Sequence, residues 1–225
     1  MSLYRFCRCV ARPFIAMLWP TKIINKEYFF EKMLPEGGLV ICNHYSIQDT
    51  LIQIGQMYKK EIHVLAKAEA FKNKFANKFL RACGAIPIKR GEADIEATKA
   101  VLTVLKNNKI LSMYPEGTRN KAGTEQMREF KQGCARFALK TKKPILPMIY
   151  FKKHKAFHRN YLYIGEPFDL SEFYGDKSQD AFERATQKVY DKMVETRELC
   201  NKWVEENNPK MYAKQKKKGL DSEKW

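Results

Sequence analysis

The stretch LVICNHYSIQD, residues 39–49, combines a strand signal, a turn and the start of a helix. The apolar run 39–42 is typical of a buried strand. Ser46 favours the N-cap position of a helix, and Asp49, three positions later, completes a capping box. His44 therefore falls in the turn that joins the strand to the helix.

Two interpretations of His44 and Asp49 are open at this point. In the first, Asp49 only caps the helix. In the second, His44 is a general base and Asp49 is the carboxylate that orients it. Side chains five positions apart on one regular helix point about 140° from each other, since the helix has about 3.6 residues per turn. The two can meet only if His44 lies in the turn and Asp49 in the first helical turn, so both interpretations predict similar local geometry.

Strand and helix signals alternate on both sides of this stretch. Strands are expected at 21–26, 38–43, 61–66, 84–88, 109–114, 144–151 and 160–165. Helices are expected near 46–58, 69–81, 92–107 and 129–140. The alternation is typical of an α/β protein with a mostly parallel central sheet flanked by helices. Ligands of such sheets bind at the carboxyl ends of the strands, where His44 would lie.

The two ends of the chain differ from the middle segment, residues 21–206, which is expected to form the main domain. Residues 1–20 predict an amphipathic membrane-association segment, because apolar residues recur at helical spacing while the charged residues are all arginines. A helix packed on the rest of the protein is the alternative. Pro13 is expected to kink this helix or to start a second one. A long helix over 178–206, with Ser178 as N-cap, precedes a lysine-rich tail, residues 207–225, that we expect to be mobile.

The composition restricts the partners and the compartment. The 225 residues carry 42 Lys and Arg against 25 Asp and Glu, a net charge of +17. Such an excess suits an anionic membrane surface, phosphorylated substrates or nucleic acid, although a solvated basic surface explains it equally well. The six cysteines show no zinc-type spacing, so no metal site is expected and a reducing cytosol is the simplest setting. Neither a membrane-spanning segment nor a signal peptide is expected.

Three further stretches follow strand signals. GAIPIKR, residues 84–90, ends in a basic pair, although a strand that runs out to a solvated surface would look the same. YPEGTR, residues 114–119, offers a turn with a hydroxyl, backbone amides and a guanidinium, which are donors suited to a phosphate. PILPMI, residues 144–149, is an apolar strand that, taken alone, is typical of a buried core.

NHYSIQD, GAIPIKR, YPEGTR and PILPMI resemble, in order and spacing, the four sequence blocks of the glycerolipid acyltransferases. The resemblance is closest to the bacterial 1-acyl-sn-glycerol-3-phosphate acyltransferases. It extends over about residues 20–165 and includes the connecting segments LAKAE, 65–69, and FKQG, 130–133. The fourth block departs from the family, since Leu146 and Met148 stand where valine or isoleucine is usual.

The resemblance implies roles for individual residues. His44 would be the general base that takes a proton from an acceptor hydroxyl, and Asp49 would orient and stabilise its imidazole, with no covalent acyl-enzyme. The residues that would bind the glycerol phosphate of the acceptor are Arg90, Glu116, Gly117, Thr118 and Arg119, with Lys67 a weaker candidate. As a carboxylate, Glu116 fits better as a residue that orients Arg119 or holds the turn than as a phosphate ligand.

The resemblance also implies a reaction and its partners. The chain would acylate the sn-2 hydroxyl of 1-acyl-sn-glycerol 3-phosphate (lysophosphatidic acid) to give phosphatidic acid, with an acyl-carrier-protein or coenzyme A thioester as donor and no cofactor. It would work as a peripheral protein on the cytoplasmic face of the cell membrane. The alternatives are glycerol 3-phosphate or a lysophospholipid as acceptor, or a non-catalytic basic protein that binds membranes or nucleic acid. Nucleic acid is disfavoured because no binding motif is found.

Overall fold

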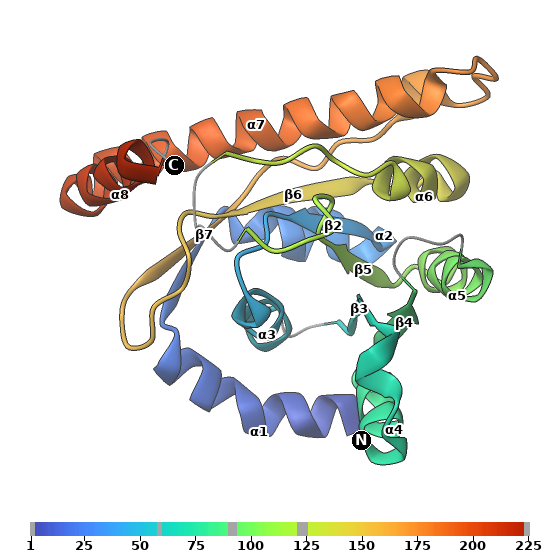
Figure 1. Ribbon diagram of the computed structural model, residues 1–225, viewed down its shortest axis with the longest axis horizontal. Helices are drawn as coiled ribbons and strands as arrows, with labels where there is room; N and C mark the ends of the chain where they lie inside the picture. Colours follow the sequence, from blue (N-terminus) through green and yellow to red (C-terminus); the bar gives the residue numbers. More distant parts are fainter. Residues whose placement is uncertain (1–2, 58–59, 90–93, 121–125, 223–225) are drawn as a thin grey trace.

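A single sheet with the strand order β1-β7-β6-β2-β5-β3-β4 lies at the centre of the molecule (Figure 1). The computed structural model describes residues 3–57, 60–89, 94–120 and 126–222. The strands are β1 (Thr21–Ile24), β2 (Gly38–Cys42), β3 (Ile62–Lys67), β4 (Ala85–Ile88), β5 (Ile110–Met113), β6 (Ile145–Tyr150) and β7 (Asn160–Ile164). Neighbouring strands are parallel, except that β6 and β7 are antiparallel. The predicted α/β fold with a mostly parallel sheet is confirmed.

Helices cover both faces of this sheet. They are α1 (Leu3–Leu18), η1 (Tyr28–Met33), α2 (Leu34–Glu36), α3 (Ile47–Gln56), η2 (Ala68–Phe71), α4 (Lys74–Ala82), α5 (Ile95–Lys106), α6 (Gly133–Thr141), η3 (Ser171–Phe173), α7 (Ala181–Asn207) and α8 (Pro209–Ser222). In Figure 1, α6 and α7 lie above the sheet, and α1 and α3 lie below it.

The residues of β2 divide the core into two layers. Leu39 and Ile41 belong to the cluster that includes residues of α5, α6 and α7, whereas Val40 and Cys42 belong to the cluster with residues of η1, α1 and α3. Successive strand side chains point to opposite faces, so a strand between two helical layers has to be apolar at every position. This explains the continuous apolar run, which places the His44 turn at the middle of the carboxyl edge of the sheet.

A tight turn sets the amino end of β2. Gly37 has a φ of 69°, and a Cβ built there would lie 2.3 Å from the backbone carbon of Asn108. Gly38 donates its amide to Lys109 O and so aligns β2 with β5. Only a residue without a side chain fits this combination of a left-handed backbone and close approach.

The structure corrects several sequence-based expectations. The predicted helix 69–81 is divided, because the Asn73 side chain accepts hydrogen bonds from the amides of Phe75 and Ala76 and starts α4 anew. The long C-terminal helix begins after Asp180 rather than at Ser178. The expected mobile tail forms α8, which Pro209 can begin because its fixed φ suits the first helical position. Met211 and Tyr212 of α8 pack against the core beside α7.

Helix α1 has two apolar sides. Tyr4 and Ile15 are buried, and Ile15 packs against Gly55 of α3. The other side exposes roughly half of each of five apolar residues: Leu3, Phe6, Val10, Phe14 and Met17. Pro13 lies inside the helix and does not end it, so of the two expected outcomes, a kink or a second helix, the second helix does not occur in this segment. None of the described helices is both long and apolar enough to cross a membrane.

We predict that Gly37→Ala destabilises the fold by about 2–5 kcal/mol, because it adds left-handed strain and forces the backbone of Asn108 to move. For a domain of this size the melting temperature should fall by roughly 5–15 °C. Gly175→Ala is the matched control: its φ of 83° imposes similar strain, but no atom lies within 4 Å of the added Cβ. Equal losses in thermal melting of the two variants would contradict the role given to the close approach.

Candidate active site

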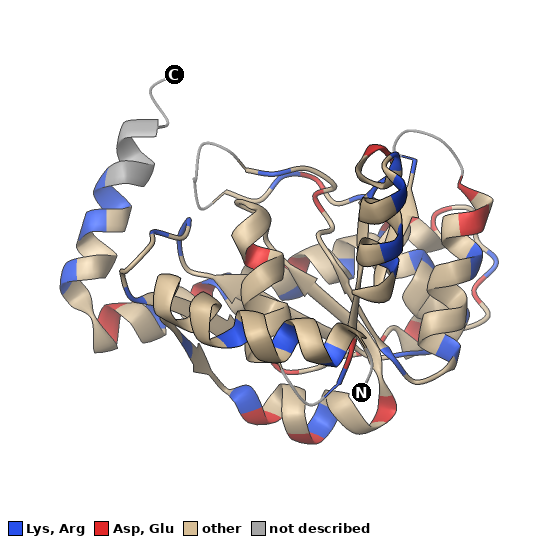
Figure 2. Cartoon of the chain, turned by 90° about the horizontal axis from the view of Figure 1, so that it is seen from below, with Lys and Arg blue, Asp and Glu red and all other residues tan. Residues whose placement is uncertain are grey.

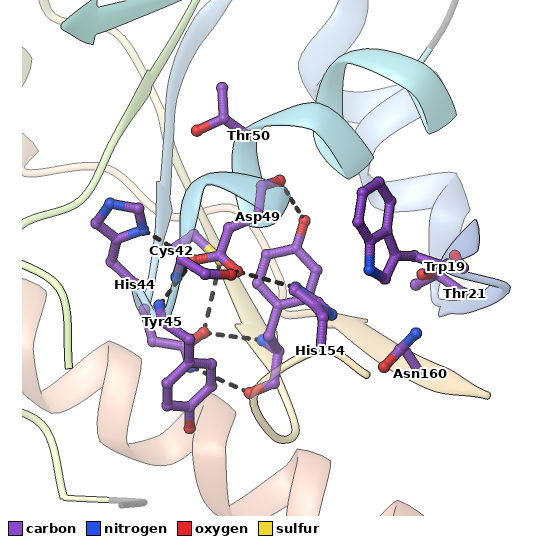
Figure 3. A network of polar contacts seen from close by, with 12 residues as sticks. Trp19, Thr21, Cys42, His44, Tyr45, Asp49, Thr50, His154 and Asn160 are labelled. Atoms are coloured by element: carbon purple, nitrogen blue, oxygen red, sulfur yellow. Dashed lines mark hydrogen bonds and ion pairs between the residues drawn. The ribbon is translucent and has the colours of Figure 1, made fainter. Parts of the chain in front are cut away.

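His44 and Asp49 are in direct contact (Figure 3). His44 Nδ1 lies 2.8 Å from Asp49 Oδ2, and the His44 side chain is 8% exposed. The same carboxylate oxygen accepts the backbone amides of Tyr45 at 2.7 Å and Ser46 at 2.8 Å. Ser46 is the N-cap of α3 and forms a capping box with Asp49. The expectation that the two side chains meet is confirmed, and the cap and the contact with the imidazole are one structure.

Asp49 is ionised at every ordinary pH. Its burial raises the pKa, but the contacts of the carboxylate with His154, His44 and the Ser46 amide lower it more, and the result is about 2. Since the carboxylate then holds no proton, the hydrogen between it and His44 is on Nδ1. The lone pair that can take up a proton is therefore on His44 Nε2.

The phenol ring of Tyr114 supports the imidazole of His44 from one side. The two rings are stacked, with centroids 3.8 Å apart and planes 14° from parallel. Tyr114 Oη lies 2.7 Å from the hydroxyl of Thr50 in α3. Burial, followed by the charge of Asp49, raises the pKa of Tyr114 well above its ordinary value, so the phenol is neutral. Tyr114 thus joins the turn after β5 to the turn after β2.

Asn43 extends the pairing of β2 and β6 beyond the strand. Its side chain donates to Tyr150 O at 3.0 Å and accepts the Tyr150 amide at 2.8 Å, as a further strand residue would. Tyr150 Oη in turn donates to the backbone oxygen of Asp49 at 2.8 Å. Arg197 of α7 donates to the backbone oxygens of Tyr150 and Phe151, each at 3.1 Å. The end of β6 is thereby fixed against the first turn of α3.

The 114–119 turn lies directly beside the His44 turn. Asn120 donates its amide to His44 O at 2.7 Å. Gly117 has a φ of 68°, and a Cβ there would approach Lys131 Cε to 2.9 Å. The buried carboxylate of Glu116 accepts the amide of Arg128 at 3.3 Å. Burial raises the pKa of Glu116, and hydrogen bonds from the amides of Arg128 and His44 counteract this shift. Glu116 therefore holds the turn, and a direct contact with substrate stays a prediction.

The remaining candidate residues lie at the same carboxyl edge or outside the described residues. Thr118 and Arg119 are exposed in the turn after β5. Lys67 is exposed at the end of β3. Arg90 lies outside the described residues, so its expected place beside Arg119 stays a prediction. Among the residues that the structure describes, no group of His, Cys, Asp and Glu is arranged to hold a metal ion.

A cavity of about 300 Å³ opens at this edge, beside Tyr114 and Gly117. Its apolar lining comes from Leu65, Ile88, Met113, Cys134 and Phe137, and its lysines are Lys89 and Lys131. Ligand pockets are typically lined in this way, by apolar side chains with a few polar groups. The cavity suits a molecule that has an apolar part and an anionic part.

His154 belongs to the cluster although no sequence pattern marks it. Its Nε2 lies 2.9 Å from Asp49 Oδ1, on the side of the carboxylate away from His44 (Figure 3). It comes from the connection between β6 and β7, so only the folded chain brings it to Asp49. Asn43 and Tyr114, by contrast, stand inside the stretches that the sequence singled out.

Comparisons with known proteins show which family the chain belongs to. The family model described as Acyltransferase matches residues 22–151, which is more than half of the chain. A 1-acyl-sn-glycerol-3-phosphate acyltransferase of Bacillus subtilis is 28% identical over 203 residues, covering 86% of this chain and 96% of that protein. The protein of the same name from Streptococcus pneumoniae is 24% identical over 204 residues, covering 87% of this chain and 74% of that protein.

A solved structure shares the fold. It is the crystal structure of the 1-acyl-sn-glycerophosphate (LPA) acyltransferase PlsC from Thermotoga maritima, which superposes with a TM-score of 0.62 at 20% identity. The match covers 87% of this chain and 78% of that one. It therefore covers more of the chain than the family model, which matches residues 22–151.

The low pKa of Asp49 predicts acid sensitivity. The carboxyl titrates at about 2 in the folded chain against an ordinary value of 3.8, so it stabilises the fold above pH 4 and loses this effect as the pH falls through 2. The contribution is about 2 kcal/mol. We expect the free energy of unfolding in urea to fall less between pH 4 and pH 2 in Asp49→Asn than in the parent. If the free energy of unfolding falls equally with pH in the two proteins, the low pKa is wrongly assigned to Asp49.

Proposed function

Because the chain belongs to the Acyltransferase family, we propose that it transfers a fatty acyl group from a thioester to the sn-2 hydroxyl of 1-acyl-sn-glycerol 3-phosphate and so forms phosphatidic acid. The observation that carries this proposal is the 2.8 Å contact of His44 Nδ1 with an ionised Asp49, which leaves Nε2 as a base at the carboxyl edge of the sheet. The names of the relatives from Bacillus and Streptococcus support this choice of acceptor.

In the proposed reaction, His44 Nε2 removes the proton of the acceptor hydroxyl as its oxygen attacks the thioester carbonyl. The carbon–oxygen bond forms and a tetrahedral oxyanion results. Collapse of this intermediate breaks the carbon–sulfur bond, and the imidazolium returns its proton to the leaving thiolate. Asp49 stabilises the imidazolium between these two steps, because their charges are opposite and the contact is buried. No enzyme nucleophile is needed, since the acceptor supplies the oxygen.

The acceptor carries a phosphate and an acyl chain, and the site has groups for both. Arg119 and Thr118 supply a forked guanidinium and a hydroxyl for the phosphate, and Lys67 supplies a further cation at the end of β3. Arg90 is proposed for the same role from the sequence alone. The apolar cavity beside Tyr114 is lined in part by Gly117, the residue before Thr118, and suits a hydrocarbon chain of the acceptor or the donor. An acyl-carrier-protein or coenzyme A thioester serves as donor, and the chemistry needs no cofactor.

The exposed side of α1 fits a membrane surface. Its five half-exposed apolar residues form one stripe, and its only charged side chains are arginines. Seen from below, α1 and α4 both face the viewer and carry basic but no acidic residues (Figure 2). On α4, Phe75 is 87% exposed. Apolar side chains flanked by cations suit the interface of an anionic bilayer. The protein would bind there peripherally, on the cytoplasmic face, where a lipid acceptor is available.

The test of the proposed reaction is product formation by purified protein. We expect lysophosphatidic acid, supplied with an acyl-carrier-protein or coenzyme A thioester, to give phosphatidic acid, whereas glycerol 3-phosphate and lysophosphatidylcholine react more slowly. His44→Ala and Asp49→Asn should each lower kcat by about 10²–10⁴, the range for a positioned general base. If the Asp49→Asn protein is folded and has a normal kcat, Asp49 has no part in catalysis and only caps α3. Faster acylation of another acceptor would change the substrate assignment.

The membrane contact predicts a separate defect. Phe6→Ser combined with Phe14→Ser should reduce cosedimentation with anionic phospholipid vesicles at least several-fold, because two half-exposed rings no longer enter the bilayer. Ile95→Ser is the matched control, since Ile95 is 67% exposed but lies on α5. High salt should weaken binding of the parent as well. The contact is assigned wrongly if the α1 variant binds vesicles as the control does.

A further inference from the structure

The position of His154 is unexplained by the reaction as proposed. Its side chain is 1% exposed and points at the carboxylate of Asp49 from the side opposite His44 (Figure 3). It follows residue 151, where the match to the family model ends. Two imidazoles therefore share one carboxylate: His44 uses Oδ2, and His154 approaches Oδ1.

Packing alone does not account for a histidine at this place. Neither ring nitrogen of His154 has a well-aligned hydrogen-bond partner within the described part of the chain, and the 2.9 Å approach to Asp49 is an off-axis, electrostatic contact. A buried polar ring with incomplete hydrogen bonding costs stability, and an apolar side chain of similar size would avoid that cost. Such local exceptions concentrate at functional sites.

The connection that carries His154 is held at several points. The ring of Tyr150 lies edge-on to the imidazole, with centroids 4.4 Å apart and planes at 87°. Phe157 donates its amide to Leu18 O at 2.7 Å, and Asn160 donates its amide to Pro20 O at 2.8 Å. The last residue of α1 and the segment that follows it thus fix the β6–β7 connection. This arrangement keeps the imidazole against Asp49.

We propose that His154 is a positioning residue for the acyl transfer, acting through Asp49. The imidazole of His154 approaches Oδ1 with Nε2 at 2.9 Å and attracts it, so that it resists rotation of the carboxylate and keeps Oδ2 on His44 Nδ1. When His44 accepts the proton of the acceptor hydroxyl, it becomes an imidazolium cation. The Asp49 carboxylate is already in position to stabilise this cation. This inference rests on the proposed function, but it concerns a residue that does not touch the substrate.

Three single variants test the proposal kinetically. His154→Ala should lower kcat about 10–100-fold, the size of loss found for outer partners of metal-bound histidines, and leave the KM for lysophosphatidic acid within about twofold. His154→Gln should restore part of the rate, because its amide N–H can reach the position of Nε2. His158→Ala is the matched control: His158 lies on the same connection, is exposed, and its ring Nδ1 lies 2.8 Å from Ala156 O rather than near Asp49.

A double-mutant cycle distinguishes this role from a general loss of structure. In an Asp49→Asn background, His154→Ala should cause little further loss in kcat, because it acts through the carboxylate that has been removed. Losses that multiply would overturn the proposal, as would a normal kcat in His154→Ala or a rate in His154→Gln no better than in His154→Ala.

A spectroscopic measurement tests the same contact without any substrate. In nitrogen-edited proton spectra of the labelled protein, the His44 Nδ1–H signal should be protected in the parent, in His158→Ala and in His154→Gln. In His154→Ala it should exchange rapidly with water. An unchanged signal would overturn the proposal even if no acceptor were acylated. Absence of acylation by the parent, with the signal lost in His154→Ala, would overturn the proposed function and leave the positioning contact intact.

Discussion

A carboxylate with no exposed surface has to be surrounded by donors, and Asp49 meets this requirement with groups from several parts of the chain. The amides of Tyr45 and Ser46 and the imidazole of His44 belong to the same turn, and His154 comes from a distant connection. The contacts of the carboxylate join three elements: the turn after β2, the first turn of α3, and the link from β6 to β7. The geometry of the site follows from the need to keep one negative charge solvated by protein groups.

The same elements connect the site to the surface proposed to meet the membrane. α1 packs on α3, the helix that begins beside Asp49, through Ile15 and Gly55. The residues just after α1 hold the connection that carries His154. The apolar stripe of α1 and the cluster of His44 and Asp49 are thus connected through the packing of α1 on α3. An acceptor with a phosphate and a hydrocarbon chain requires both kinds of surface within a short distance.

Local patterns were sufficient for most of the fold and for the pair at its centre. The apolar run before His44, the capping residues and the strand–helix alternation are all signals within short stretches, and the sheet and the contact with Asp49 followed from them. His154 is 105 residues from Asp49 in sequence, and no local pattern marks it. The helix after Pro209 was not predicted, because its many lysines obscure the apolar pattern. Only Met211 and Tyr212 pack on the core there, among the residues that the structure describes. Long-range packing decides such features, and a single sequence does not encode it in any short motif.

The parallel pairing of β1 with β7 joins Thr21 to Asn160, a strand residue that is synthesised 139 residues later. A ribosome that adds roughly 5–20 residues per second needs about 7–30 s to deliver that partner. Throughout this interval the edge of the sheet next to α1 is incomplete, while the apolar stripe of α1 has already been made. If α1 binds a bilayer as proposed, the nascent chain reaches that bilayer before its last sheet strand exists, and folding and attachment overlap in time.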